Sequence, residues 1–234
     1  HVSKSVPFYY EGHDLIARIS DFFLFDGSVS YDLGCSTGQA THVLAEHNKG
    51  RNISFIGIDT ETGMVEMARK KCSEFSNVEI VEADIMDVEL QPCDMVVAYY
   101  TVQFVRPKNR QILIDRIYNA LNWGGAFLLF EKVRGADARF QDISTALYTD
   151  YKLEKGYNEE EIVNKARSLK GILEPFSSLG DIDLLKRAGF VDIMSTAEQN
   201  WPKGRSKIGP LDVMQSTVLR VVPVVHRRDP RCFV

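Results

Sequence analysis

A short apolar stretch that runs into a glycine-spaced turn is the feature that most constrains how this chain can fold. Residues 29–38 read VSYDLGCSTG, a pattern typical of a buried strand followed by a tight turn and a helix. Glycines in such a turn allow the backbone to approach a ligand closely. The spacing from Asp32 is Asp-x-Gly-x-x-x-Gly, not Gly-x-Gly-x-x-Gly. The turn therefore predicts a nucleoside-containing ligand beyond the first strand, and its spacing disfavours a dinucleotide.

Apolar strands alternate with amphipathic helices through the first part of the chain. Helical spacing of apolar residues between Asp14 and Phe25 predicts a helix before the first strand. Five strands are predicted, at residues 29–33, 53–58, 78–81, 94–98 and 126–130. Their near-continuous apolar composition fits a sheet that helices cover on both faces. This alternation predicts an α/β fold with a doubly wound, Rossmann-like parallel sheet.

The pattern changes after the fifth strand. Residues 137–173 look wholly helical and rich in charge, and residues 178–188 predict another helix. Strands six and seven are predicted at residues 190–194 and 217–222. A chain of 234 residues suits one domain. We therefore expect a single domain, residues 1–234, with a seven-stranded, mostly parallel sheet, an N-terminal helical segment (1–27) and a helical insertion between strands five and six (137–175).

The composition limits the partners and the compartment. A formal net charge of −4 does not favour a nucleic-acid-binding surface, and no run approaches the roughly 18 consecutive apolar residues of a membrane span. The four cysteines form no C-x-x-C pair and lie at no zinc-ligand spacing from a histidine. We expect a cytoplasmic protein without a bound metal. The first residue is His1, so we also expect the chain to begin partway into its gene product.

Acidic residues follow the second and third predicted strands. Asp59 ends strand two, and its carboxylate has enough acceptor sites for both hydroxyls of a ribose. Asp84 follows strand three, where it would accept a hydrogen bond from an adenine amino group while Ile85 packs on the ring. Combined with the glycine turn, the two acids predict S-adenosylmethionine (SAM) as the ligand. Two alternatives stay open: an NAD-binding oxidoreductase, and a doubly wound domain whose acids only cap helices.

Several motifs resemble one enzyme family. Residues 31–36 (YDLGCS), with Gly38 and Thr41, look like motif I of class I SAM-dependent methyltransferases. More narrowly, the chain resembles the carboxy-S-adenosylmethionine synthase family from about Lys4 to Phe190. The residues that carry this narrower resemblance are 5–7 with Tyr9, 101–105, 121–126, 131–132, and 156–157 with Glu159, Glu161 and Ile162. The resemblance implies SAM binding and a homodimer, with the helical insertion reaching toward the partner subunit.

The residue pattern and the resemblance together give a predicted cofactor site. The strand ends supply most of its members, and the resemblance implies Tyr9, Cys35 and Thr60 in addition. The predicted cofactor-binding residues are Tyr9, Asp32, Gly34, Cys35, Ser36, Gly38, Asp59, Thr60, Met64, Asp84, Ile85, Tyr99 and Gln103. Tyr99 and Glu131 are the candidate catalytic residues, because Tyr99 replaces a cofactor-contacting position and Glu131, after strand five, is a potential base or acceptor-positioning group.

Two positions depart from the family pattern. Tyr99 stands where the family has asparagine, and Ala166 stands where the family has an arginine that pairs with the carboxylate of the modified sulfonium. Arg167 is the next residue, about 100° away around a helix. Alanine cannot hold a carboxylate in the two-pronged manner of arginine. We therefore expect ordinary SAM as the cofactor and methyl transfer to a small-molecule acceptor.

Three other functions remain open from the sequence alone. The first is attack on the aminocarboxypropyl arm of SAM, or its cyclisation, either of which releases methylthioadenosine. The second is synthesis of carboxy-SAM. The third is a SAM-binding protein without catalysis.

Overall fold

The computed structural model describes residues 6, 9–195 and 218–223 of the chain. A single sheet runs through it in the order β3-β2-β1-β4-β5-β7-β6. The strands are β1 (Val29–Leu33), β2 (Ser54–Asp59), β3 (Val78–Glu82), β4 (Cys93–Tyr99), β5 (Leu121–Glu131), β6 (Met194–Ser195) and β7 (Val218–Pro223). The strands β1 to β5 are parallel, and β7 is antiparallel to both of its neighbours. The α/β, Rossmann-like prediction is thus confirmed for the parallel part of the sheet.

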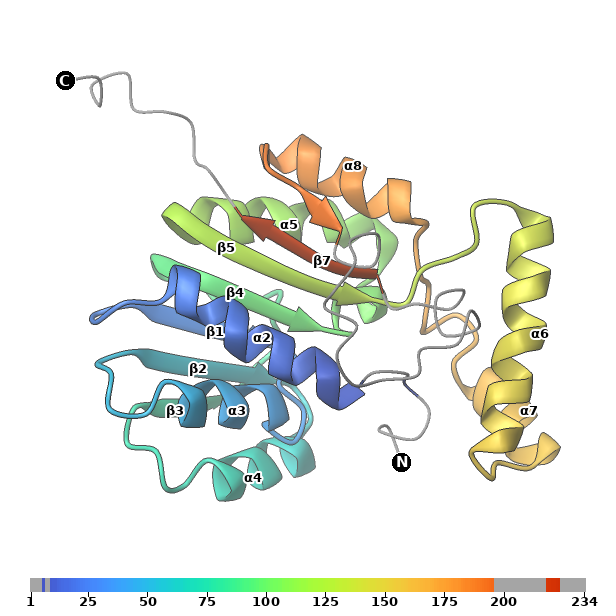
Figure 1. Ribbon diagram of the computed structural model, residues 1–234, viewed down its shortest axis with the longest axis horizontal. Helices are drawn as coiled ribbons and strands as arrows, with labels where there is room; N and C mark the ends of the chain where they lie inside the picture. Colours follow the sequence, from blue (N-terminus) through green and yellow to red (C-terminus); the bar gives the residue numbers. More distant parts are fainter. Residues whose placement is uncertain (1–5, 7–8, 196–217, 224–234) are drawn as a thin grey trace.

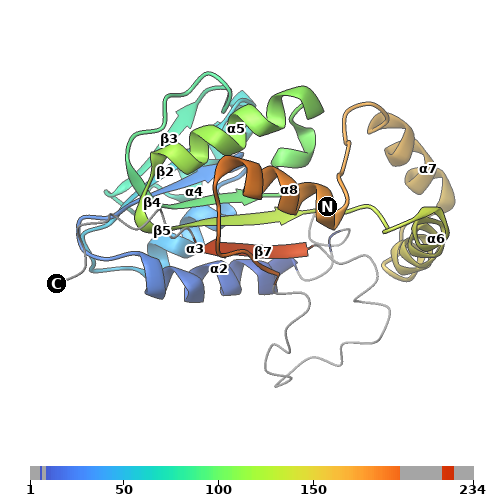
Figure 2. The same ribbon diagram turned by 90° about the horizontal axis from the view of Figure 1, so that it is seen from above.

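Helices cover both faces of the sheet (Figures 1 and 2). They are α2 (Tyr9–Phe23), α3 (Gln39–His47), α4 (Thr62–Lys71), α5 (Pro107–Ala120), α6 (Ala138–Glu154), α7 (Glu159–Ser168) and α8 (Ser178–Ala188), with a 3-10 turn η1 (Val102–Phe104) after β4. Alternate residues of β4 face opposite layers: Val96 packs with the core beneath α5 and α8, and Val97 packs with the core beneath α2 and α3. The strands are therefore buried on both sides, as their apolar composition predicts.

The strand order places a switch point between β1 and β4. The chain winds outward through β2 and β3 on one side of β1, and through β4 and β5 on the other. Leu33 of β1 is level with Ile58 of β2 and with Ala98 of β4, so the three carboxyl ends lie together. In open α/β sheets, ligands bind at this position. The helices α6 and α7 stand beside the same edge, away from the two helical layers (Figure 1).

Several predicted boundaries need correction. The prediction that residues 190–194 form strand six is wrong for residues 190–193, because only Met194–Ser195 pairs with β7. Phe190 is apolar because it packs in the core beneath α5 and α8. The prediction of a wholly helical segment at 137–173 is also wrong. Gly156 has φ +87°, and Asn158 begins a new helix with a capping box, so α6 and α7 are separate.

Other boundaries shift outward. The first helix begins at Tyr9 instead of Asp14, and β5 begins at Leu121 because that residue already pairs with Cys93. The seventh predicted strand corresponds to β7, and Thr217 lies outside the described residues. The single-domain assignment stays a prediction. Among the described residues, no helix combines the length and apolar character needed to cross a membrane, and no three potential metal-ligating side chains cluster.

Candidate functional site

The glycine turn after β1 folds tightly against the loop after β4. Gly34 and Gly38 have φ +73° and +75°, values that glycine adopts without strain. The backbone N–H groups of Gly34 and Cys35 both donate to the Ile58 carbonyl oxygen, at 2.8 and 3.0 Å. A Cβ atom on Gly34 would lie 2.4 Å from Thr101 Oγ1. Only a glycine therefore allows the turn after β1 to pack this closely against the Thr101 side chain.

Gly38 has a second, structural reason to be glycine. It is the N-cap of α3, and a Cβ atom there would lie 3.0 Å from the Ala68 Cβ atom. The Cys72 thiol also lies 3.8 Å from the Gly38 carbonyl oxygen. Close packing between α3 and α4 therefore explains this glycine without a ligand, and its role as a cofactor contact stays a prediction.

Asp32 is a buried carboxylate at the end of β1. Its Oδ2 accepts from the Thr41 backbone N–H at 3.1 Å and from the Thr41 hydroxyl at 2.6 Å. Its Oδ1 is buried without a partner among the described residues. Burial raises the pKa of Asp32 to about 6, although the hydrogen bonds from Thr41 oppose this rise. Asp32 thus ties the glycine turn to the first turn of α3 and leaves one acceptor atom free.

Asp59 joins the loops that follow β1 and β2. Its Oδ2 accepts from the Ser36 backbone N–H at 2.8 Å, and its Oδ1 accepts from the Glu61 backbone N–H at 3.0 Å. Each carboxylate oxygen has a further acceptor site. The carboxylate is therefore fixed in orientation and still able to accept two ribose hydroxyls. Ser36 has φ +50°, and its hydroxyl lies 3.7 Å from the Met64 sulfur. These contacts bring Met64 beside the predicted ribose site.

Asp84 and Ile85 form a loop that α5 holds from behind. The Met86 backbone N–H donates to Asp84 Oδ1 at 2.8 Å. Arg116 Nη1 donates to the Met86 and Ile85 carbonyl oxygens at 2.6 and 3.4 Å. The sequence analysis missed Arg116, because helical spacing does not reveal which loop an arginine reaches. These contacts fix the backbone where the adenine ring is predicted to lie.

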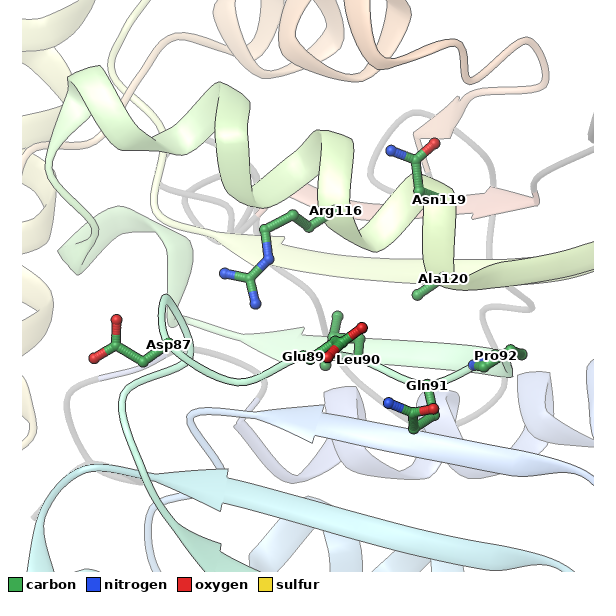
Figure 3. Close-up of a pocket in the computed structure, with 8 residues that line it drawn as sticks. All are labelled: Asp87, Glu89, Leu90, Gln91, Pro92, Arg116, Asn119 and Ala120. Atoms are coloured by element: carbon green, nitrogen blue, oxygen red, sulfur yellow. The ribbon is translucent and has the colours of Figure 1, made fainter.

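A pocket of about 410 Å³ lies between this loop and α5 (Figure 3). Arg116 projects from α5 into it, facing the segment that leads to β4. Its lining residues are Asp87, Glu89, Leu90, Gln91, Pro92, Arg116, Asn119 and Ala120. None of the predicted cofactor residues lines this pocket, so it is a separate hollow behind the adenine loop.

Tyr99 ends β4 and faces α2. Its hydroxyl donates to the Tyr9 carbonyl oxygen at 2.8 Å. Its ring lies 4.5 Å from that of His13 and 4.7 Å from that of Phe130, centroid to centroid. Burial raises the pKa of Tyr99 far above its usual value. The hydroxyl is therefore neutral and already donates a hydrogen bond, which disfavours a role as a base. Its catalytic role stays a prediction.

Gln103 and Glu131 brace the loop after β4 against β5. Gln103 Nε2 donates to the Tyr100 carbonyl oxygen, and its Oε1 accepts from the backbone N–H of Lys132, both at 3.1 Å. Glu131 is 4% exposed, and its Oε1 has no partner among the described residues. Burial raises the pKa of Glu131 well above its usual value; Asp181 adds to this rise, while Arg110 and backbone hydrogen bonds from the loop oppose it. Both side chains are therefore buried and bonded to the loop, and neither projects into open solvent.

The braced loop contains a strained residue. Tyr100 has φ +61° and is, with Ser36, one of two non-glycine residues with positive φ in the described part of the chain. The two lie at the ends of adjacent strands, β4 and β1. Positive φ at a bulky residue persists only where the surroundings impose it, and such residues cluster at functional sites. The strain thus falls at the switch point.

A lysine that directly follows β5 lies close to a tyrosine and a lysine on α6. The Lys132 and Lys152 ammonium groups lie 5.3 and 4.1 Å from the centroid of the Tyr148 ring. Burial lowers the pKa of both lysines. Within the described residues, neither ammonium group forms a salt bridge. The sequence analysis did not single out either lysine.

Comparisons with known proteins place this arrangement in a family. Residues 31–125 match a family model described as a methyltransferase domain. The carboxy-S-adenosyl-L-methionine synthase of Staphylococcus epidermidis is 34% identical over 213 residues, covering 91% of this chain and 90% of that protein. Its counterpart from Nautilia profundicola is 38% identical over 193 residues, covering 82% of both. The chain belongs to the carboxy-S-adenosyl-L-methionine synthase family. The resemblance predicted from the sequence is confirmed.

Solved structures agree at the level of the fold. The SAM-dependent methyltransferase SibL has a TM-score of 0.58 and 17% identity, covering 92% of this chain and 55% of that one. A putative methyltransferase solved in complex with the Haloferax volcanii activator Trm112 has a TM-score of 0.61 and 15% identity, covering 92% and 90%. At these identities the likeness shows the α/β fold alone.

Proposed function

We propose that the protein is a SAM-dependent transferase that moves a methyl group to a small-molecule acceptor. One observation carries the proposal: two backbone N–H groups orient the Asp59 carboxylate at the switch point of the sheet, and no other described residue occupies its remaining acceptor sites. Family membership supports both SAM as the cofactor and transfer from SAM as the class of reaction.

The residues at the carboxyl edge fit the parts of SAM. Asp59 would accept both ribose hydroxyls, with Ser36, Thr60 and Met64 beside them. Asp84 and Ile85 would hold the adenine ring. The methionine portion would lie along the glycine turn, where Oδ1 of Asp32, which has no partner among the described residues, offers an acceptor for its ammonium group. The remaining proposed contacts are Tyr9, Cys35, Gly38, Tyr99 and Gln103.

SAM supplies a methyl group already activated by the positive sulfur, and attack by an acceptor lone pair leaves S-adenosylhomocysteine. The chain's task is therefore to align the acceptor with the sulfur–methyl bond and to exclude water. Glu131 serves this task by holding the loop after β4, because its carboxyl group is buried against that loop. A dedicated base is needed only for an acceptor of high pKa.

The helical insertion indicates the character of the acceptor. The ammonium groups of Lys132 and Lys152 converge on the Tyr148 ring without a salt bridge among the described residues. Two half-buried positive charges that share one ring repel each other, and a negatively charged ligand would relieve that repulsion. We propose that the acceptor carries an acidic group that docks here.

A second candidate is the reaction that gives the relatives their name, synthesis of carboxy-SAM. The observation that favours it is 34–38% identity over at least 80% of each chain. Ala166 argues against it, because the family resemblance calls for an arginine there. Ala166 lies on α7, an exposed helix without a buried residue, and Arg167 follows it.

We also propose a cytoplasmic homodimer. The insertion presents large apolar side chains that the described residues leave exposed: Phe140, Ile143 and Leu153 on α6 and Val163 on α7 are each at least 36% exposed. A second copy of the chain would bury them. Light scattering coupled to size-exclusion chromatography measures this directly, and the mass of a single chain at micromolar concentration would contradict it.

Product analysis tests the proposed reaction. The purified protein is incubated with SAM and a metabolite extract, and the small molecules are identified by mass spectrometry. Methyl transfer yields S-adenosylhomocysteine and an acceptor heavier by one methylene unit. Carboxy-SAM as the product would replace the first candidate with the second, and methylthioadenosine would indicate loss of the aminocarboxypropyl arm. Unchanged SAM would contradict both candidates.

A further inference from the structure

Tyr99 occupies space that only a glycine in α2 can provide. Gly12 is buried within α2, and a Cβ atom there would lie 2.3 Å from Tyr99 Oη and 3.1 Å from two carbon atoms of the ring. Glycine inside a helix destabilises it relative to alanine. The chain therefore has a glycine at a position where helix propensity disfavours it, and the ring of Tyr99 fills the resulting gap.

Two hydrogen bonds converge on the backbone of Tyr9. The Tyr99 hydroxyl donates to the Tyr9 carbonyl oxygen at 2.8 Å, and His13 Nδ1 lies 2.7 Å from the same oxygen. A carbonyl oxygen only accepts, so Nδ1 carries the proton of the imidazole. Burial lowers the pKa of His13 to about 4, so the ring is neutral at pH 7. Tyr9 is the first residue of α2, where helices ordinarily fray.

The ring of Tyr99 also packs against the aromatic residues around it. Its centroid lies 5.7 Å from that of Tyr9, 4.9 Å from that of Tyr100 and 4.7 Å from that of Phe130. Tyr100 and Phe130 belong to the strained loop and the braced end of β5 described above. One side chain thus connects the first residue of α2 to the carboxyl ends of β4 and β5.

We propose that Tyr99 is a positioning residue that acts through Tyr9. Its hydroxyl fixes the backbone of Tyr9, so that the half-buried Tyr9 side chain is held over the SAM site, and Gly12 provides the space that this contact requires. The inference rests on the proposed function, because Tyr9 is there a cofactor contact. It changes the role expected of Tyr99 from a group that reacts to a group that holds another residue in place.

Calorimetric titration of SAM into single and double variants tests this proposal. Tyr99→Phe removes only the hydroxyl and should weaken SAM binding by about three- to tenfold, the usual worth of one hydrogen bond. Tyr9→Ala should weaken binding at least as much. In the Tyr9→Ala background, Tyr99→Phe should have no further effect, because its influence passes through the Tyr9 side chain. Tyr10→Phe, at an exposed neighbour, is the matched control and should bind as the wild type does.

Gly12→Ala gives a second, independent cycle. The added Cβ atom should displace the Tyr99 hydroxyl and weaken SAM binding by about tenfold or less. It should weaken binding less in the Tyr99→Phe background, where the nearest atoms are ring carbons at 3.1 Å instead of the hydroxyl oxygen at 2.3 Å. If Gly12→Ala does not fold, the Tyr9 and Tyr99 variants still decide the question.

The outcomes separate this inference from the proposed function. Wild-type affinity for SAM in Tyr99→Phe, with only a lower melting temperature, would mean that Tyr99 is purely structural and would overturn the inference. Additive losses in the Tyr9→Ala/Tyr99→Phe double variant would also overturn it. A wild-type protein that does not bind SAM would overturn the proposed function itself.

Discussion

The carboxyl edge of the sheet and the helical insertion are built in opposite ways. At the edge, backbone N–H groups fix Asp59, Asp84 is held in its loop, and the core beneath is fully buried at Ile58. In the insertion, α7 has no buried residue and α6 buries only Ser144. The edge is therefore organised before any ligand arrives, whereas few internal contacts hold the insertion in place.

This difference suggests how the family varies its chemistry. A preorganised edge can hold the same nucleoside in many members, because its geometry depends on backbone and on a few acids. An insertion with exposed side chains tolerates substitution, since surface changes away from packed contacts cost little stability. Ala166 lies in the insertion. We expect cofactor binding to be insensitive to the insertion and the fate of the cofactor to depend on it.

The largest expected effect concerns stability. Ile58 is fully buried, and Ile58→Ala should lower the free energy of unfolding by about 2–5 kcal/mol through lost burial and a cavity. Val163 on α7 is 45% exposed, and Val163→Ala should cost less than about 0.5 kcal/mol. Urea unfolding of both variants measures the contrast. Equal losses would show that the insertion is as tightly packed as the sheet.

The next effect concerns the ribose site. Asp59→Ala removes the acceptor of both proposed ribose hydroxyls and should weaken SAM binding by about 100-fold, or roughly 3 kcal/mol. Glu61→Ala changes a neighbouring exposed acid whose backbone N–H stays in place, and it should leave the affinity within about twofold. Calorimetric titration compares the two. A similar loss in both variants would assign the effect to general negative charge.

A third effect is the pH dependence that Asp32 imparts. Its folded-state pKa is raised to about 6 from 3.8, so the folded protein binds this proton more tightly than the unfolded chain does. Stability contributed by Asp32 is therefore present at low pH and is lost as the pH rises from about 4 to 6. Relative to Asp32→Asn, the wild type should lose about 2–3 kcal/mol across this window.

Urea unfolding at pH 4, 5 and 6 measures this difference. The comparison with Asp32→Asn is needed because His13, whose pKa is lowered to about 4, contributes stability that rises with pH over the same range. If the difference in the free energy of unfolding between the wild type and Asp32→Asn does not change with pH, then burial does not raise the pKa of Asp32 in the folded protein.

The smallest expected effect tests the insertion. Ala166→Arg restores the side chain that the family pattern places there and should strengthen binding of carboxy-SAM by about tenfold, near the lower limit for a charge-assisted hydrogen bond. The affinity of the Ala166→Arg variant for SAM should equal that of the wild type. Asn164→Arg adds the same charge on the same helix and is the control. Wild-type protein that binds carboxy-SAM much more tightly than SAM would contradict the assignment of ordinary SAM.

The sequence analysis located the edge better than the insertion for a physical reason. The turn after β1 and the acids after β2 and β3 are local patterns, and parallel strands bring such ends together whatever the details of packing. The break between α6 and α7 depends on one glycine and one capping asparagine inside a charged, helical composition. Phe190 and Ile193 are apolar like strand residues, but they pack in the core beneath α5 and α8, and Val191 between them is exposed.

The surroundings of Tyr99 and Glu131 could not be predicted in the same way. Gly12 lies nearly 90 positions before Tyr99 in the chain, and only the packed structure shows that one makes room for the other. Glu131 comes at the end of an apolar strand and looks accessible in the sequence, yet it is buried and bonded by the backbone of the loop after β4. Non-local contacts of this kind leave no periodicity in the sequence.

A double-label experiment tests the central claim most directly. SAM labelled separately on the methyl carbon and on the aminocarboxypropyl arm is incubated with the protein and a metabolite extract, and both labels are followed by mass spectrometry. The account predicts that the methyl label moves to a small molecule that carries an acidic group, while the arm label stays in S-adenosylhomocysteine. Both labels retained in carboxy-SAM, or the arm label separated from the sulfur, would contradict it.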